Sequence, residues 1–375
     1  MEGLSDPYRN SMLVRRLKAS TEIGVFDLDH TLTGEKEAQI KAHALINEKG
    51  PMVINSARET GMMMSSEALE ASRKYGYRRA APNLHRDPET GLLSYVRPEL
   101  LERFAGHLNP AAIIGFGGGI LLRQQDRGYA MDDSFAELLG GYDFRERMLG
   151  HLRAIDFEGD LITSLSMLED DSAFAEGRTD VQPLFWRIQI NPKSEAQKTD
   201  LKLRISSYLL EIGEYATVDI VDESRPWDNV FAIYIVPKLG TKQASADHLL
   251  RSSLSEANVG IPDVNLTLAD DAFTGLRMVT DVLPGAKGTF VLPGNAPVAR
   301  HLIPSSDSYG KPFAGEDVRW LLERLTPTDV AGVYDCFMPR DKPNRRFIIA
   351  DQAVEGAVAA QSILALDEKG LLYKR

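Results

Sequence analysis

The chain has 375 residues, 43% of them apolar and 26% charged, which is an ordinary globular composition and enough for two domains or one large domain with an insertion. Its net charge of -11 argues against a general binder of nucleic acids or anionic membranes, and the single cysteine, Cys336, excludes an intrachain disulfide framework. No apolar run approaches the roughly 20 residues that span a bilayer, and the N-terminus lacks the apolar core of a secretion signal, so we expect a cytoplasmic protein.

The first third of the chain alternates between predicted strands and predicted helices. Residues 21–26 and 50–56 are short apolar runs typical of buried strands, whereas 35–48 and 59–75 have the spacing and composition of helices. This alternation implies parallel strands in an α/β sheet. Residues 111–123 (AAIIGFGGGILLR) then predict a strand, a glycine turn and a second strand; the glycines lack the G-x-G-x-x-G spacing of a dinucleotide site.

The composition changes after Arg123 and predicts a second unit with mixed structure. Residues 126–180 are acidic, with helix-like stretches near both 134–139 and 146–152. The segments that follow predict, in order, a strand at 184–190, a helix at 194–212, and strands at 215–221 and 230–236.

The α/β pattern resumes with a helix at 243–254 and strands at 264–269 and 288–293. We therefore expect a discontinuous α/β core, formed by residues 1–125 and 237–375. An α+β domain of residues 126–236 is inserted into it.

Polar residues stand at the predicted ends of several core strands. Asp27 and Asp29 follow the first strand, Ser56 follows the second, and Asp270 with Asp271 follows the strand at 264–269. Ligands of parallel sheets bind at the carboxyl ends of the strands, so these side chains are expected to share one crevice. Lys242 opens the helix that precedes the third of these strands and would join them there.

This set of groups suits phosphoryl transfer. Carboxylates bind a divalent cation, a lysine and a serine bind phosphate oxygens, and an aspartate can attack phosphorus. Each residue also has a plainer interpretation. Ser56 could be a helix N-cap, Asp270 and Asp271 a solvated turn, and Lys242 an exposed lysine, although the helix dipole disfavours a cation at that position and so favours an anionic partner.

The ordered motifs resemble those of the haloacid dehalogenase (HAD) superfamily. The segments FDLDHTL, VINSARET and PKLGTKQASADHLL are similar to its first three motifs, and LTLADDAFTGLRM stands where the family has its acidic fourth motif. The chain looks most like sucrose-phosphate phosphatases and Cof-type sugar phosphatases, which have a large α+β cap of the C2 type. The resemblance implies a Rossmann-like core and a cap that selects the substrate. It is weak over residues 77–110, 126–180 and 303–345, so no role is assigned to the last of these segments.

The resemblance also implies roles for individual residues. Asp27 would be the nucleophile that forms an aspartyl-phosphate, and Asp29 the general acid and base. Ser56 and Lys242 would hold the phosphate. Mg²⁺ would be bound by Asp27, the backbone carbonyl of Asp29 and Asp271, with Asp270 in support.

Two further residues, Arg58 and Asn295, are weaker candidates for contacts with the substrate. The fourth motif departs from the family because Gly275 stands where a second aspartate is usual, so the geometry of the metal site could differ.

We therefore expect a Mg²⁺-dependent phosphatase that hydrolyses a small phosphate ester, a phosphorylated sugar or sugar derivative. Two alternatives stay open. One is a non-catalytic sugar-phosphate binder that is paired with a glycosyltransferase, and the other is a phosphomutase that would use the same two aspartates, Asp27 and Asp29.

Overall fold

The computed structural model describes the parts of the chain that form three sheets and the helices around them. The described residues are 11–28, 31–32, 36–56, 84–86, 93–95, 109–126, 128–139, 162–166, 186–190, 192–213, 216–222, 231–237, 239–270, 277–292, 324–330, 333–337, 345–350 and 359–372.

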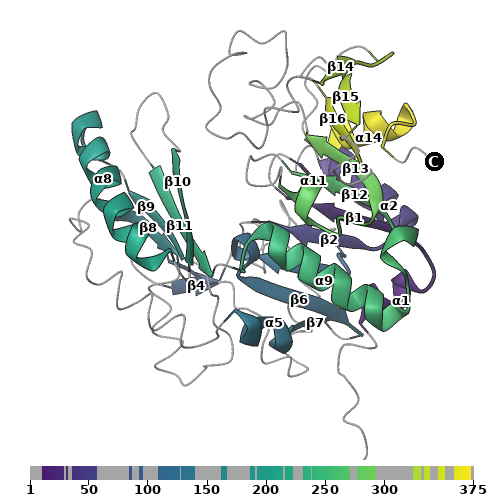
Figure 1. Ribbon diagram of the computed structural model, residues 1–375, viewed down its shortest axis with the longest axis horizontal. Helices are drawn as coiled ribbons and strands as arrows, with labels where there is room; N and C mark the ends of the chain where they lie inside the picture. The colour runs from purple at the N-terminus through teal and green to yellow at the C-terminus, as the bar shows by residue number, and fades with distance from the viewer. Residues whose placement is uncertain are drawn as a thin grey trace, which may run out of the picture.

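A ten-stranded sheet organises the larger part of the described chain (Figure 1). Its order is β14-β15-β16-β13-β12-β1-β2-β5-β6-β7, and the six strands from β16 to β5 are parallel to one another. The remaining pairs at both edges are antiparallel. The strands are β1 (Glu22–Phe26), β2 (Met52–Asn55), β5 (Ala112–Gly115), β6 (Ile120–Gln125), β7 (Gly128–Met131), β12 (Asn265–Ala269), β13 (Lys287–Leu292), β14 (Thr326–Pro327), β15 (Val333–Phe337) and β16 (Arg345–Ala350).

Helices cover this sheet in two groups, and the helices contact one another within each group. The helices α1 (Met12–Leu17) and α11 (Met278–Asp281) both contact α9 (Lys242–Ala257), whereas α14 (Ala359–Glu368) contacts α2 (Lys36–Lys49). The connection from β1 through α2 to β2 runs one way along the sheet, and that from β12 through α11 to β13 runs the other way. Because such crossovers are right-handed, the two groups cover opposite faces.

The core follows from the uninterrupted apolar character of the central strands. All four residues of β2 and of β5 are buried, as expected where helices cover both faces of a parallel sheet. On the α9 face, Val25, Val53 and Ile114 pack in one cluster with Leu249 and Leu250 of the helix. The predicted α/β fold with a mostly parallel sheet is thus confirmed.

A separate four-stranded antiparallel sheet lies in the middle of the chain, drawn in blue and teal in Figure 1. Its order is β10-β11-β9-β8, with β8 (Ile162–Ser166), β9 (Trp186–Ile190), β10 (Ala216–Asp222) and β11 (Phe231–Pro237). The helix α8 (Glu195–Ile212) contacts β10 and is capped by Ser194, whose hydroxyl accepts a hydrogen bond from the Gln197 N–H at 3.2 Å. Three of these strands and the helix coincide with predicted elements; β8 was not predicted.

The large sheet continues beyond residue 125, where the sequence predicts the start of the cap. The strand β7 pairs with β6 across a tight turn at Gly128, whose φ is 116°. The following helix, α5 (Asp133–Leu138), places Phe135 in the main hydrophobic core, and Leu139 directly after it is also buried there. Acidic composition suggested the earlier boundary, but strand pairing joins residues 128–131 to the large sheet, and Phe135 and Leu139 pack in its core. The predicted downstream boundary, at residue 237, coincides with the end of β11, and the division of the chain into a core and a cap stays a prediction.

The remaining differences between the predicted and the described elements concern two helices and five strands. The helices predicted at 59–75 and 146–152 lie outside the described residues. A short sheet of β3 (Leu84–Arg86) and β4 (Leu93–Tyr95) and the edge strands β14 to β16 were not predicted. Two 3₁₀ turns, η2 (Phe116–Gly118) and η5 (Ile261–Asp263), complete the described elements. Within the described residues, no helix combines the length and the apolar character that crossing a bilayer requires.

Candidate active site

The central feature of the site is a buried lysine between two aspartates. The Lys242 Nζ donates a hydrogen bond to Asp27 Oδ1 at 2.9 Å and another to Asp270 Oδ2, also at 2.9 Å. Relative to their full accessibility, Lys242 is 8% exposed, Asp27 3% and Asp270 0%. Three segments that are distant in sequence therefore meet in one charged, largely desolvated contact.

Strand register explains why the two aspartates are neighbours. In the parallel pair β1/β12, Phe26 lies opposite Ala269, so the next residue on each strand, Asp27 and Asp270, falls at the same edge. The Asp27 N–H donates to the Ala269 carbonyl at 2.9 Å and fixes this alignment. The chain leaves β1 and β12 in opposite directions along the sheet, so this position is the topological switch point, where α/β sheets bind ligands.

Lys242 is placed by the first turn of α9. Thr241 caps this helix, because its hydroxyl accepts a hydrogen bond from the Ala244 N–H at 3.2 Å. A lysine at a helix N-terminus is disfavoured by the helix dipole, and the sequence therefore pointed to an anionic partner. The structure supplies two carboxylates, those of Asp27 and Asp270, as that partner.

The glycine turn at 116–118 supports the same end of α9. Gly117 and Gly118 have φ values of 67° and 113°, a region that favours glycine. A Cβ atom on Gly118 would lie 2.4 Å from the carbonyl carbon of Thr241, so only glycine permits this approach. Ser245 closes the contact by donating from its hydroxyl to the Gly118 carbonyl at 2.7 Å. The glycine-rich segment thus serves close packing against the start of α9.

Ser56 lies at the same edge of the sheet as Asp27, at the end of the neighbouring strand β2. It is 1% exposed, its N–H donates to the Ile114 carbonyl at 2.9 Å, and its own carbonyl accepts from the Gly117 N–H at 3.0 Å. The residue before it, Asn55, was not predicted as a site residue, yet its amide donates to the Lys242 carbonyl at 2.8 Å. The available signal was a carboxamide at the end of an otherwise apolar strand.

Five residues that the sequence analysis singled out lie outside the described part of the chain. Their roles therefore stay predictions: Asp29 as general acid, Asp271 as metal ligand, Arg58 and Asn295 as substrate contacts, and Gly275 as a departure from the family pattern.

The described carboxylates fit a hard divalent cation. Both contact the same Lys242 nitrogen at 2.9 Å, so Asp27 Oδ1 and Asp270 Oδ2 can be no more than about 5.8 Å apart, twice that distance. The three side chains carry a formal charge of -1, and carboxylate oxygens are the ligands that Mg²⁺ prefers. No group of three or more potential histidine, cysteine or acidic ligands occurs among the described residues, so a complete ligand set would draw on residues beyond them.

A buried ion-pair network anchors the other end of α9. Arg123 of β6 donates to Asp132 Oδ2 at 2.8 Å and to the hydroxyls of Ser252 and Ser253 at 2.7 and 2.9 Å. Asp132 also accepts the Phe135 N–H at 3.2 Å and so caps α5. Burial raises the pKa of the Asp132 carboxyl, but the Arg123 charge and the hydrogen bonds outweigh it and hold that pKa below its usual value.

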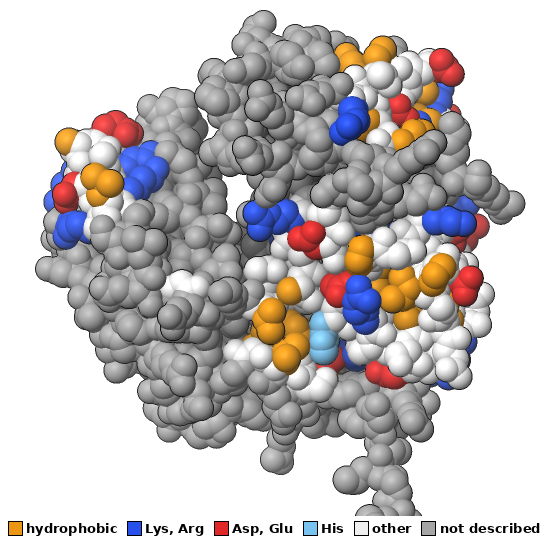
Figure 2. All heavy atoms as spheres, in the orientation of Figure 1, with side chains coloured by type: hydrophobic (Ala, Val, Ile, Leu, Met, Phe, Trp, Pro, Cys, Tyr) orange, Lys and Arg blue, Asp and Glu red, His pale blue; other side chains and the backbone are white. Residues whose placement is uncertain are grey.

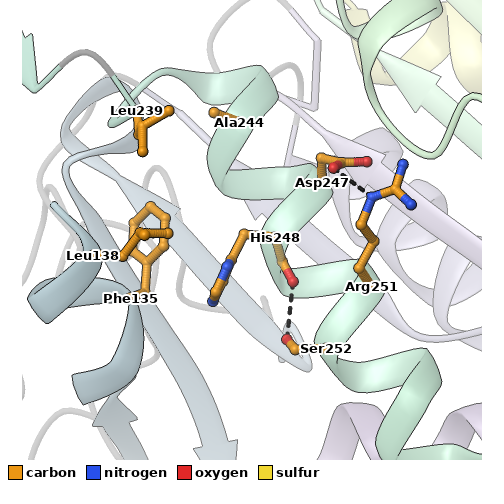
Figure 3. Close-up of a pocket in the computed structure, with 8 residues that line it drawn as sticks. All are labelled: Phe135, Leu138, Leu239, Ala244, Asp247, His248, Arg251 and Ser252. Carbon is orange, nitrogen blue, oxygen red and sulfur yellow. Dashed lines mark hydrogen bonds and ion pairs between the residues drawn. The ribbon is translucent and has the colours of Figure 1, made fainter.

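Beside this network, α5 and α9 form a pocket of about 330 Å³ (Figure 3). Phe135, Leu138 and Leu239 form its apolar wall, and His248 and Arg251 stand on the helix side. Figure 2 shows hydrophobic side chains gathered on this face of the molecule. Leu138 and Leu239 are 51% and 48% exposed. Of the predicted site residues that the structure describes, namely Asp27, Ser56, Lys242 and Asp270, none lines this pocket.

Comparisons with known proteins give only distant likenesses. No protein-family model matches the sequence, and no curated protein matches it significantly. Among solved structures, the fold is similar to that of a Plasmodium falciparum IMP-nucleotidase, with 11% identity and a TM-score of 0.35 over 72% of this chain. It is similarly close to an Aspergillus fumigatus trehalose-6-phosphate phosphatase, with 9% identity and a TM-score of 0.35 over 74% of this chain and 86% of that one. The chain covers 63% of the nucleotidase, and likenesses this weak say nothing about activity.

Proposed function

We propose that this chain is a Mg²⁺-dependent phosphatase of the HAD type, acting through an aspartyl-phosphate on Asp27. The observation that carries the proposal is the contact of one buried lysine with two aspartates at the switch point of a parallel sheet. The order of the sequence motifs supports it independently, since FDLDHTL ends in the turn that follows β1 and the lysine motif begins α9.

Two covalent steps complete the proposed reaction. In the first, an oxygen of Asp27 attacks phosphorus, the bond from phosphorus to the leaving oxygen breaks, and Asp29 gives a proton to that oxygen. In the second, Asp29 takes a proton from water while the water oxygen attacks phosphorus. The aspartyl-phosphate bond breaks, which regenerates Asp27 and releases inorganic phosphate.

Lys242 and Ser56 are the phosphate-binding groups in this proposal. The Lys242 ammonium already lies 2.9 Å from the nucleophile's carboxylate, so it can neutralise charge that builds up on the transferred group. A bound Mg²⁺, held by Asp27, the Asp29 carbonyl and Asp271 with support from Asp270, would polarise the phosphate oxygens. The family resemblance motivates this assignment of ligands.

The proposed substrate is a phosphorylated sugar or sugar derivative. The four-stranded sheet with α8 is inserted in the chain between the strands that carry Asp27 and Asp270, as a substrate-selecting cap would be. A cap of this kind closes over the ester, excludes water and contacts the leaving group. The resemblance to sugar phosphatases with a large cap supports the choice of a sugar.

The decisive experiment is a phosphate-release screen over sugar phosphates, nucleotides and an aryl phosphate, each with Mg²⁺ and with a chelator. Asp27→Asn keeps the shape of the side chain and removes the nucleophile, so it should abolish turnover. Asp335→Asn is the matched control, because Asp335 pairs with Arg346 in the edge strands of the same sheet.

The screen can also overturn the proposal. Turnover by Asp27→Asn close to that of the wild type would exclude the covalent mechanism. A wild-type protein that binds sugar phosphates but releases no phosphate would instead be the non-catalytic binder. Transfer of phosphate between positions of one sugar, without release, would identify a mutase.

A further inference from the structure

Asn55 is a fully buried polar residue at the end of an apolar strand. The three residues before it in β2, Met52, Val53 and Ile54, are all buried and apolar. Side chains alternate along a strand, so Asn55 points to the same face as Val53, which packs in the cluster under α9. A carboxamide therefore occupies a place where core packing alone favours an apolar side chain, and burying it costs free energy.

The carboxamide of Asn55 contacts the first residues of two helices. Its Nδ2 donates to the backbone carbonyl of Lys242, the first residue of α9, at 2.8 Å. The same nitrogen lies 3.5 Å from the sulfur of Met278, the first residue of α11. The other polar atom, Asn55 Oδ1, is buried and has no hydrogen-bond partner among the residues that the structure describes. Within the described residues only Nδ2 of the carboxamide is used, and the shorter of its two contacts is the one to the lysine's own backbone.

We propose that Asn55 is a positioning residue for Lys242. A lysine side chain has four rotatable carbon bonds and reaches many positions, so the place of its ammonium depends on where its backbone is held. Here that ammonium must lie 2.9 Å from each of two carboxylates. Asn55 fixes the backbone from the strand next to Asp27, which ties the lysine to the same edge of the sheet. The catalytic meaning of this contact rests on the proposed phosphatase function, whereas the contact itself does not.

The test compares two variants that each remove one buried hydrogen bond to α9. Asn55→Ala removes the contact at the first residue of the helix. Ser253→Ala is the matched control, because its hydroxyl accepts a hydrogen bond from Arg123 at 2.9 Å and it is also 0% exposed. Ser253 lies eleven residues further along, about 16 Å at 1.5 Å per residue, and so lies far from the ammonium.

Two readouts separate positioning from a general loss of stability. Well below the melting temperature, Asn55→Ala should lower kcat about 10- to 100-fold, with a smaller change in KM, whereas Ser253→Ala should change kcat less than about twofold. Amide hydrogen exchange of residues 243–246 should accelerate in Asn55→Ala and not in Ser253→Ala. If Asn55→Ala does not fold, Asn55→Leu replaces it, because leucine also branches at Cγ, fills the site and lacks the donor.

The outcomes keep this inference distinct from the proposed function. If the wild type releases no phosphate from any ester, the phosphatase proposal fails and hydrogen exchange alone decides the role of Asn55. Unchanged exchange at residues 243–246 in the asparagine variants overturns the inference. So does a loss of kcat that Ser253→Ala matches.

Discussion

Replacing the buried lysine should destabilise the protein strongly. Lys242→Met removes a cation that contacts two carboxylates, both almost completely buried. Breaking a buried ion pair by removing one partner costs about 3–5 kcal/mol, because an uncompensated charge remains inside the protein. Here two like charges remain, with contacting oxygens no more than about 5.8 Å apart. At an effective dielectric constant of about 20, their mutual repulsion is about 3 kcal/mol or more, and in Lys242→Met no cation offsets it.

The expected loss of about 3 kcal/mol or more is a large part of the 5–15 kcal/mol that stabilises a typical domain. It is measured as the change in the free energy of unfolding by urea, followed by circular dichroism. Lys41→Met is the control, since Lys41 forms an exposed ion pair with Glu37 on α2 and should lose less than about 0.5 kcal/mol. Asp27→Asn in the Lys242→Met background should recover part of the loss, because it removes one of the two charges.

Magnesium provides a second arm of the same experiment. If the two carboxylates bind Mg²⁺, the metal should stabilise Lys242→Met more than the wild type, because it then replaces the missing positive charge. Saturation at 100 times the dissociation constant stabilises by about 2.7 kcal/mol. A Lys242→Met protein as stable as the wild type, in buffer without metal, would refute the buried contact.

Three further predictions concern the surroundings of this contact. Gly118→Ala should reduce phosphate release and the free energy of unfolding more than Gly370→Ala does. Both glycines have positive φ, but only at Gly118 would the added Cβ atom collide with backbone atoms, those of Thr241. Equal losses of stability and unchanged turnover would contradict this reasoning. Asp271→Asn should raise the Mg²⁺ concentration needed for half-maximal phosphate release more than Asp270→Asn does, and the reverse order would reassign the metal ligand. Because the pKa of Asp132 is lower in the folded protein than the value of about 3.9 in the unfolded chain, its carboxylate stabilises the fold. This contribution is complete above the pKa of the unfolded chain and is lost as the pH falls through the pKa of the folded protein. Unfolding by urea between pH 5 and about 2 should therefore show a steeper loss for the wild type than for Asp132→Asn, and parallel curves would exclude this contribution.

Much of the core could be predicted because its signals are local. The strands at β1, β2 and β12 are short apolar runs that end in a polar residue, and the helix α9 begins at a lysine after a threonine cap. Such patterns depend on residues within one or two turns of each other. The polar strand ends then predict a shared edge, because parallel strands deliver their carboxyl ends to one side.

The features that were missed depend on partners far away in the chain. The strands β14 and β15 at one edge of the large sheet and β7 at the other are defined by the strands with which they pair. Asn55 looks like an ordinary polar strand end until the Lys242 carbonyl, 187 residues later, is placed above it. Likewise, the need for glycine at position 118 becomes clear only from its contact with the Thr241 backbone.

The sequence by itself determined which residue types stand at the ends of the core strands. Strands and helices can be recognised from residues that are close in sequence, so their ends can be predicted without the tertiary structure. Only the tertiary structure decided that β1 and β12 are adjacent, so that Asp27 and Asp270 meet one ammonium 215 residues after the first and 28 before the second. The physical reason is that a side chain's charge partner is set by strand order and register, which depend on the packing of the whole sheet. A buried lysine at a helix start is stable only where that packing brings carboxylates to it.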